Sequence, residues 1–369
     1  MDVGFSEEQH EIRRALREAL DKHSDSAAVR AATATDHGYD TQVWRRLCDQ
    51  TGLPGLAIPE QYGGVGLTFT EVAIACEEMG RALYPSPFLA TCVQAAAALR
   101  HSRDADACER YLPGIAAGTT TAAFAHTEPT LTVRSAGGEH RLTGTATHVV
   151  DGAHADLVLV PARLDGAPAL FALDAGASGL TRTSLPVLDQ TRTQARLDLT
   201  ETPARLIGTP GEPTGELLCR VREFTEVAIA AESVGGAFRC LDMTVEYAKL
   251  RVQFGRPIGS FQAVKHRCAD MYVQLETARS ALRYAAWTAT EAESSGPGGD
   301  ELPLMAPLVM TTATDTYRRI AEETIQLHGG VGFTWEHDAH LHLKRATTSA
   351  LLFGPRSRQR ERIAASAAI

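Results

Sequence analysis

Two stretches that combine arginine, glutamine and glycine offer hydrogen-bond donors suited to a phosphate-bearing ligand. The first runs from Arg251 to Gln262 (RVQFGRPIGSFQ) and lies between two long helical patterns. It places a guanidinium at the end of one helix, a Gly-x-Pro turn, and an amide side chain at the start of the next helix. Such donors could clamp a pyrophosphate and a neighbouring nucleoside. A capped turn between two helices, with no ligand, explains the same residues equally well.

The second stretch runs from Gln326 to Trp335 (QLHGGVGFTW), with Gly329 and Gly330 directly after a helical pattern. Adjacent glycines let the backbone approach a ligand closely, and they are also a common way to end a helix. A third stretch, Ala125–Pro129 (AHTEP), opens a region with strand periodicity and carries little information by itself. Neither a P-loop signature nor Gly-x-Gly-x-x-Gly after a strand is present, so the sequence indicates neither a nucleoside triphosphatase nor a Rossmann dehydrogenase.

Three histidines near the C-terminus raise the question of a metal site. His337, His340 and His342 do not all share one helical face, because positions i and i+3 do and positions i and i+5 do not. The segment Glu336–His342 is therefore predicted to be a polar interface helix, and no metal is expected.

The charge of the chain restricts its partners. An acidic protein, here with a formal net charge of -9, gains no counterion release on nucleic acid or on an anionic membrane. A small-molecule ligand is therefore expected, without nucleic acid or membrane as a partner. An anionic ligand stays possible, because all but four of the 36 basic residues are arginine, which grips phosphate through a planar fork.

The seven cysteines include no CxxC pair, and their odd number fits neither a disulfide framework nor a zinc site. A reducing cytoplasm is therefore the expected compartment. The N-terminus has no basic segment followed by an apolar one, and no apolar run reaches the ~18 residues that span a bilayer. We expect neither targeting nor membrane anchoring.

The periodicity of the apolar residues changes twice along the chain. Helical spacing begins near Ser6, a plausible N-cap, and is interrupted across the Gly- and Pro-rich segment 52–66. An alternation of period two then predicts a small antiparallel sheet or barrel up to about residue 208. Helical patterns return after Pro213 and are broken by a linker at 294–300.

These patterns predict a mainly α protein with a central β domain. A chain of 369 residues exceeds the size at which one hydrophobic core stops growing, so two or three domains are expected. We place a helical domain at 1–118, a β-sheet or barrel domain at 119–210, and a second helical domain at 211–369.

Taken together and in this order, the three stretches and the loop Pro59–Gly66 (PEQYGGVG) resemble the acyl-CoA dehydrogenase family. The resemblance covers nearly the whole chain. It implies a helical N-terminal domain, a central β domain, a C-terminal four-helix bundle, and FAD held at a subunit interface. The implied activity is the introduction of an α,β double bond into an acyl-CoA thioester, with an electron-transfer flavoprotein or a similar acceptor as the electron partner.

The resemblance also assigns cofactor contacts. Arg251 and Gln262, eleven residues apart, match the family pair that grips the FAD of the neighbouring subunit. Gln326, Gly329 and Gly330 match the segment that lies along the adenosine portion of that same FAD.

The groups around the chain's own flavin depart from the family pattern. Thr127 matches the threonine that hydrogen-bonds the subunit's own flavin ring. Family members usually carry Trp-Ile-Thr behind the ring, whereas the matching place here is His148–Val150 (HVV). A hydrogen-bonding group at the flavin is therefore missing.

Both family positions for the catalytic glutamate hold other residues. One position is Phe353, and the other, twenty-six residues before Arg251, is Thr225. Neither side chain can remove the α-proton of a thioester near neutral pH. Glu226 is a weak candidate, as is Glu223, but one step along a helix turns a side chain by about 100°.

The pattern resembles the subunit that lacks the catalytic glutamate in actinobacterial heterotetrameric acyl-CoA dehydrogenases, which act on CoA thioesters of steroid side chains or other bulky acyl groups. Leu352–Pro355 and Phe333–Asp338 add to this likeness. The implied assembly is α2β2, with a second subunit that carries the glutamate. Two alternatives stay open: a self-sufficient homomeric dehydrogenase or oxidase with an unusual base, and a flavin-free scaffold or binding protein.

Overall fold

The computed structural model describes residues 4–125 and 131–367 and divides into two compact units. One unit combines the chain up to Val29 with Phe69–Tyr84 and everything from Glu226 onwards. The other contains Arg30–Thr68 and Pro85–Thr225. Each unit combines segments that are distant in sequence, so this division does not test the predicted domain boundaries at residues 118 and 210, which stay predictions.

The chain before the strands is helical, as predicted. Its elements are α1 (Glu7–His23), α2 (Ser26–Thr33), α3 (Thr41–Thr51), η1 (Leu53–Gly55), η2 (Glu60–Tyr62), α4 (Phe69–Arg81), η3 (Leu89–Ala95), α5 (Ala96–His101) and α6 (Ala105–Ala116). Helix α1 begins with a capping box, in which the Ser6 hydroxyl accepts from the Gln9 N–H and the Gln9 side chain accepts from the Ser6 N–H. The glycine-rich loop holds two short turns, and a Cβ on Gly64 would lie 1.9 Å from the Ile58 carbonyl oxygen, so this position requires glycine.

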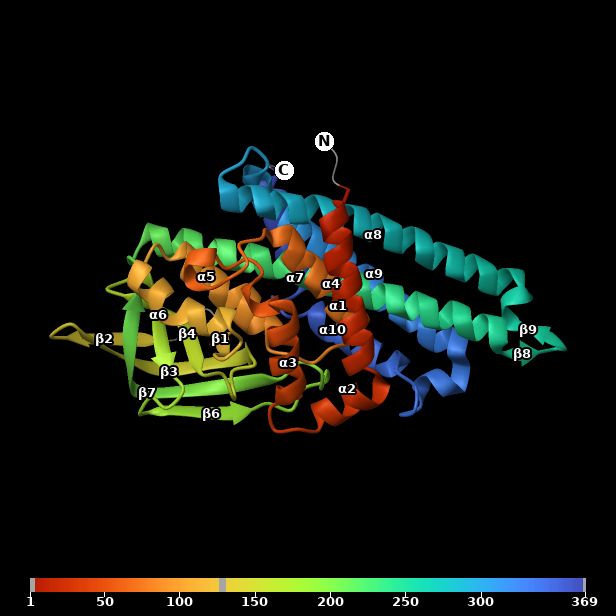
Figure 1. Ribbon diagram of the computed structural model, residues 1–369, viewed down its shortest axis with the longest axis horizontal. Helices are drawn as coiled ribbons and strands as arrows, with labels where there is room; N and C mark the ends of the chain where they lie inside the picture. Colours follow the sequence, from red (N-terminus) through yellow and green to blue (C-terminus); the bar gives the residue numbers. More distant parts are fainter. Residues whose placement is uncertain (1–3, 126–130, 368–369) are drawn as a thin grey trace. The chain divides into compact units, whose positions relative to one another are not determined.

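The strands form one sheet that closes on itself (Figure 1). They are β1 (Ala122–Phe124), β2 (Thr132–Ala136), β3 (Glu139–Val150), β4 (Leu157–Leu164), β5 (Ala167–Asp174), β6 (Leu180–Ser184) and β7 (Gln194–Ile207). β4 pairs with both β5 and β2, β2 with β3, β3 with β7, and β7 with β5, so the pairing path returns to its start. This confirms the central barrel. Its core contains Leu142, Val160, Phe171 and Leu197, all buried.

Most pairings in the sheet are antiparallel, as predicted, but β1 and β2 each pair with β4 in parallel. The prediction of an antiparallel sheet is wrong for these two pairings, because the local alternation of apolar residues does not determine which strands become neighbours.

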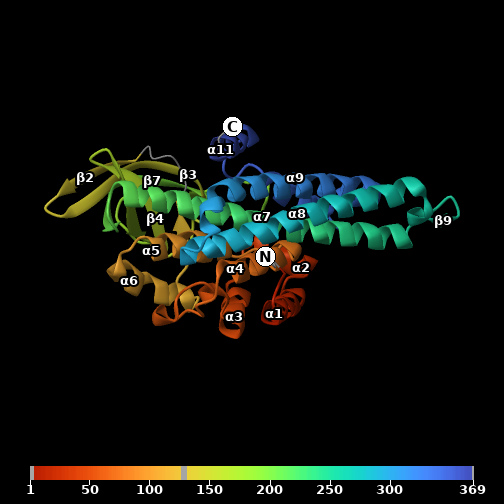
Figure 2. The same cartoon turned by 90° about the horizontal axis from the view of Figure 1, so that it is seen from above.

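The chain after the barrel returns to helices, as predicted. These elements are α7 (Glu212–Leu250), β8 (Val252–Gln253), β9 (Arg256–Pro257), η4 (Ile258–Ser260), α8 (Gln262–Ser294), η5 (Gly299–Glu301), α9 (Leu302–His328), η6 (Gly329–Phe333), α10 (Ala339–Ser349) and α11 (Arg356–Ser366). Helix α7 begins in the second unit and ends in the first. Its residues from Val227 to Ala237 are buried on every side, as expected of a helix that is apolar all round. Beyond Thr225 it runs beside α8 and α9 (Figure 2).

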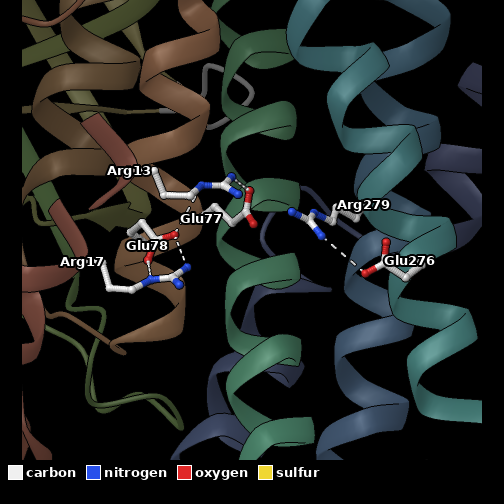
Figure 3. Close-up of polar contacts among 6 residues, drawn as sticks. All are labelled: Arg13, Arg17, Glu77, Glu78, Glu276 and Arg279. Carbon is white, nitrogen blue, oxygen red and sulfur yellow. Dashed lines mark hydrogen bonds and ion pairs between the residues drawn. The ribbon is translucent and has the colours of Figure 1, made fainter. Parts of the chain in front are cut away.

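Ion pairs to two buried glutamates attach α1 to α4 (Figure 3). The Arg13 guanidinium lies 2.6 Å from Glu77, and Arg17 donates two hydrogen bonds, of 2.8 and 2.7 Å, to Glu78. Burial raises the pKa of Glu77, and the nearby Arg13 opposes that rise. Removing one partner of such a pair leaves the other charge buried and uncompensated, so these ion pairs stabilise the packing of α1 on α4.

Among the residues described, no helix combines the length and apolar character that would let it cross a membrane.

Candidate functional site

Arg251 stands at the base of a tight hairpin that follows α7. The hairpin pairs β8 with β9, and both tip residues, Phe254 and Gly255, have positive φ (54° and 75°), as a type I′ turn requires. The Arg251 N–H donates to the Tyr247 carbonyl, and its own carbonyl accepts from the Ile258 N–H, each at 2.8 Å. The backbone of Arg251 is therefore fixed, whereas its exposed side chain makes no hydrogen bond to another described residue.

Gln262 is the first residue of α8, where backbone N–H groups lack helical acceptors. The preceding residue, Phe261, provides no side-chain cap, and the Gln262 side chain is exposed. The Arg256 guanidinium stacks on the Phe261 ring, 4.1 Å from its centre. The helix start therefore presents donors and positive charge to solvent.

The Gly329–Gly330 stretch ends α9, as predicted. Gly329 has φ 62° and ψ -141°, a conformation that only glycine adopts without strain. A Cβ on Gly329 or on Gly330 would meet nothing within 4 Å, so the backbone faces open space. The exposed side chain of Gln326 lies one turn earlier.

Stacked aromatic rings join the two candidate segments. Tyr247, one turn before Arg251, stacks on His328 with centroids 4.4 Å apart, and His328 directly precedes Gly329. The His328 Nδ1–H donates to the Thr324 carbonyl at 2.7 Å. Burial lowers the pKa of the His328 ring, and this hydrogen bond opposes that effect. The structure thus brings the ends of α7 and α9 together. This stacking was not predicted, because it joins residues that are distant in the chain.

The residues present fit the adenosine and pyrophosphate portions of FAD. Arg251, Gln262 and Gln326 provide one guanidinium and two amides, all exposed and none bonded to another described side chain. The exposed glycine backbone provides close access. A guanidinium and amide donors are the groups that phosphate and ribose oxygens require. These donors face outward, which is the arrangement needed to hold a cofactor bound by a neighbouring chain.

Large exposed apolar side chains accompany these donors. In the described part of the chain most of them fall between residues 250 and 351: Leu250, Val252, Phe254, Tyr272, Val273, Val331, Phe333, Trp335 and Leu351. Phe254, at the hairpin tip, is 92% exposed. Aromatic and aliphatic surface of this kind is typical of sites that contact another protein.

The predicted contacts to the chain's own flavin are less complete. Thr127 lies outside the described residues. His148 sits in an irregularity of β3, between Ala146 and Val149, with φ 57° and an exposed side chain. Val149 and Val150 are buried and offer no polar side-chain atom.

Thr225 and Glu226 are fully buried and already bonded. The Thr225 hydroxyl donates to the Val221 carbonyl at 2.6 Å. Glu226 pairs with Arg362 of α11, and Arg362 also donates to Gln359 at 2.8 Å. Glu223 lies 3.4 Å from Arg220, one turn away. Arg362 was not predicted, because 136 residues separate it from Glu226 and only tertiary contact pairs them.

Phe353 lies in the turn between α10 and α11 and is half-buried. The turn ends at Gly354, whose φ is 91° and whose N–H donates to the Leu351 carbonyl at 3.0 Å. The structure therefore places a phenyl ring, without a titratable group, at this family position.

The three C-terminal histidines serve different local roles. Helix α10 begins at Ala339 rather than at residue 336, because the His337 Nδ1 accepts the Ala339 N–H at 3.1 Å and ends the preceding turn. His342 is buried and shares a 2.8 Å hydrogen bond with the Tyr317 hydroxyl. The ring of His340 packs edge-on against Trp335, with centroids 4.9 Å apart. Each ring therefore has its own neighbours in the fold.

Comparison with known proteins agrees with this geometry. Sequence models described as "Acyl-CoA dehydrogenase, N-terminal domain" and "Acyl-CoA dehydrogenase, C-terminal domain" match residues 6–119 and 223–368. The chain is 39% identical over 359 residues to acyl-CoA dehydrogenase IpdE2 of Mycobacterium tuberculosis, covering 95% of this chain and 94% of that protein.

Solved structures of similar proteins superpose on nearly the whole chain. A chain of the ChsE4-ChsE5 complex from Mycobacterium tuberculosis superposes with a TM-score of 0.91 at 28% identity, covering 100% of this chain and 99% of that one. A chain of a Tcur3481-Tcur3483 steroid ACAD variant gives a TM-score of 0.87 at 30% identity, covering 98% of each chain. The layout of a helical N-terminal domain, a β-barrel and a helical C-terminal domain is thus the fold of these enzymes.

Proposed function

The chain belongs to the acyl-CoA dehydrogenase family, and on this premise we propose that it is the non-catalytic subunit of a heteromeric, FAD-dependent acyl-CoA dehydrogenase. It holds the FAD of a second acyl-CoA dehydrogenase subunit, and that subunit supplies the catalytic glutamate. The assembly introduces an α,β double bond into a CoA thioester of a steroid side chain or another bulky acyl group. An electron-transfer flavoprotein or a similar acceptor takes the electrons.

The observation that carries the proposal is the state of Glu226. It is the carboxylate nearest the family position at Thr225, and it is 0% exposed and paired with Arg362. A base must present a carboxylate to the α-proton within hydrogen-bond reach. A carboxylate enclosed by the protein and held by a guanidinium is a structural group, and Phe353 and Thr225 offer no substitute.

The groups that would face a neighbour's cofactor support the other half of the proposal. FAD, when bound, supplies a hydride acceptor for the β-carbon of the acyl group. The Arg251 guanidinium would pair with its pyrophosphate, the amides of Gln262 and Gln326 would donate to polar oxygens, and the Gly329–Gly330 backbone would admit the adenosine portion closely. The apolar side chains around the hairpin would bury themselves against the partner subunit.

The similar proteins support a heteromer and a steroid-related substrate. One of the structures is a complex of two differently named chains, ChsE4 and ChsE5, and the other is described as a steroid ACAD of Tcur3481 and Tcur3483. Identities of 28% and 30% over nearly the full length make a similar assembly a reasonable expectation for this chain.

The decisive experiment compares the lone chain with a co-purified complex. Acyl-CoA oxidation is measured with an artificial electron acceptor, and bound FAD is titrated. We expect no turnover by the lone chain, turnover at one site per unlike pair in the complex, and about half the flavin of four equivalent sites, since His148–Val150 should bind a flavin ring poorly.

Two other outcomes would support the alternatives. If the purified homomer reduces its flavin on addition of an acyl-CoA, and Glu226→Gln abolishes that reduction, the chain is a self-sufficient enzyme. If no flavin binds in the presence or absence of a partner, the chain is a scaffold that kept the fold.

A further inference from the structure

A cavity of about 390 Å³ lies within the unit that contains α1 and α10. Its walls come from the end of α1, the start of α2, the end of α4, the middle of α7 and the start of α10, whose labels are visible in Figure 1. This volume falls in the range of small-molecule sites, which is about 300–1,000 Å³. The family contacts discussed above do not line it.

The acidic side chains at this cavity already have donors. Asp21 accepts from Arg81 at 3.1 Å, and Asp25 accepts from the Ala28 N–H at 2.8 Å. Asp338 accepts from a serine hydroxyl, described next. These carboxylates therefore form part of the fold and are not free to bind a cation with all their oxygens.

The hydroxyl and imidazole side chains that line the cavity also have hydrogen-bond partners within the fold. Ser24 donates to the Ala82 carbonyl at 3.2 Å, and Ser26 donates to Asp338 at 2.6 Å. His342 shares its 2.8 Å hydrogen bond with Tyr317.

Arg239 is the exception among the polar side chains lining the cavity. It is partly buried on α7 and forms no hydrogen bond or ion pair with another described residue. A guanidinium carries five N–H donors in a planar fork that matches a carboxylate. No guanidinium nitrogen of Arg239 is among the described buried polar atoms without a partner, so its donors remain accessible from the cavity and can pair with a ligand.

The floor of the cavity is apolar. Val29, Leu83 and Leu341 pack together as a small cluster, with 4%, 3% and 6% of their surfaces exposed, and all three also line the cavity. A ligand that reaches Arg239 can therefore place a hydrocarbon portion against this cluster, which would remove the ligand's own apolar surface from water.

We propose that this cavity binds a small organic carboxylate, with its carboxylate on Arg239 and its hydrocarbon portion on Val29, Leu83 and Leu341. A monoanion is favoured over a phosphate dianion, because the rim also contains Asp21, Asp25 and Asp338, and their repulsion grows with the charge of the ligand. The site lies on this chain alone and does not depend on the function proposed above.

The test uses hexanoate as the probe and the full chain, alone or in its complex, in an isothermal titration. Wild-type protein should bind hexanoate saturably at millimolar concentration. Arg239→Gln should weaken binding at least about tenfold, since a charge-assisted hydrogen bond to the carboxylate is lost. Arg239→Lys keeps the charge without the fork and should fall between the two.

The controls separate the site from general effects of charge. Arg318→Gln removes a guanidinium from an exposed i,i+4 pair on α9 and should leave hexanoate binding unchanged. Hexanol, which has the same chain without the charge, should bind about tenfold more weakly than hexanoate. Thermal melts check that each variant is folded. If Arg239→Gln does not fold, the hexanoate affinity of Arg239→Lys tests the proposal instead.

Three outcomes would overturn the proposal. They are the absence of saturable hexanoate binding, equal binding by wild type and the Arg239 variants, and tighter binding of hexylammonium than of hexanoate. The last result would mean that the rim carboxylates dominate. The titration requires no FAD and no turnover, so its failure is distinguishable from failure of the proposed function.

Discussion

The end of α7 and its middle use polar side chains in opposite ways. At the end, Arg251 is exposed, and its guanidinium forms no hydrogen bond to another described residue. In the middle, Thr225 and Glu226 are 0% exposed and bonded to Val221 and Arg362. The same helix therefore offers donors outward at one place and uses its polar groups for folding at the other.

The contrast between these two regions separates the polar groups that are available to a ligand from those that the fold already uses. A ligand contact requires a donor that the fold has not already used, whereas a buried ion pair resists change because each charge compensates the other. Under the function proposed above, the end of α7 would bind the cofactor, whereas the Glu226 carboxylate, held by Arg362, would not act as a base.

Arg362→Leu should lower the free energy of unfolding by about 3–5 kcal/mol, because it leaves the Glu226 carboxylate buried without its guanidinium. Urea unfolding followed by circular dichroism measures this. The double variant Glu226→Leu, Arg362→Leu should recover much of the loss, since it removes both charges. A single-variant loss below about 1 kcal/mol would mean that the pair contributes no more than a surface salt bridge.

Acidification should destabilise the region next to Thr225 through His101. Its ring lies 5.4 Å from that of Phe224, and burial lowers its pKa from 6.5 to about 4. The folded chain therefore keeps the ring neutral at pH values where the unfolded chain binds a proton. The contribution of the neutral His101 ring to the free energy of unfolding is fully present above about pH 6.5. The free energy of unfolding then falls by on the order of 3 kcal/mol as the pH drops to about 4.

The matched variant for this prediction is His101→Leu, which removes the titrating ring. Its urea midpoint should depend less on pH than that of the wild type between about pH 6.5 and 4. Parallel pH profiles of the two proteins would exclude His101 as the source of acid sensitivity.

Arg251→Ala should lower FAD occupancy in the complex, because a phosphate would lose a charge-assisted bond of roughly 1.5–3 kcal/mol. The measurement is FAD per complex after dialysis. Stability should change little, because the exposed side chain makes no internal hydrogen bond. Unchanged occupancy would remove Arg251 from the cofactor site.

Gly330→Ala should have the smallest effect on folding and still weaken FAD binding several-fold. A Cβ here meets nothing within 4 Å, so stability should stay within about 0.5 kcal/mol of the wild type. Gly329→Ala is the contrasting variant, because φ 62° and ψ -141° are strained for alanine and should cost about 1 kcal/mol or more. Equal FAD affinity in wild type and Gly330→Ala would place the adenosine portion elsewhere.

Local patterns in the sequence were sufficient for the order of helices and strands. The Ser6 cap, the glycine stop at Gly329 and the linker after Ser294 all depend on residues close to one another in the chain, so their types predict the local conformation. Periodicity also indicated the central β region, and the ordered motifs are sufficient to indicate the family without any tertiary contact.

Tertiary structure decided which polar groups are used by the fold and which are left over. Glu226 and Arg362 are 136 positions apart, and the stacked rings of Tyr247 and His328 come from different helices. Similarly, Arg239 has no partner among the described residues, whereas the other polar side chains around its cavity have partners on neighbouring helices or on the backbone. Whether a side chain has a partner depends on which distant segments pack beside it, and sequence spacing along one helix cannot determine that.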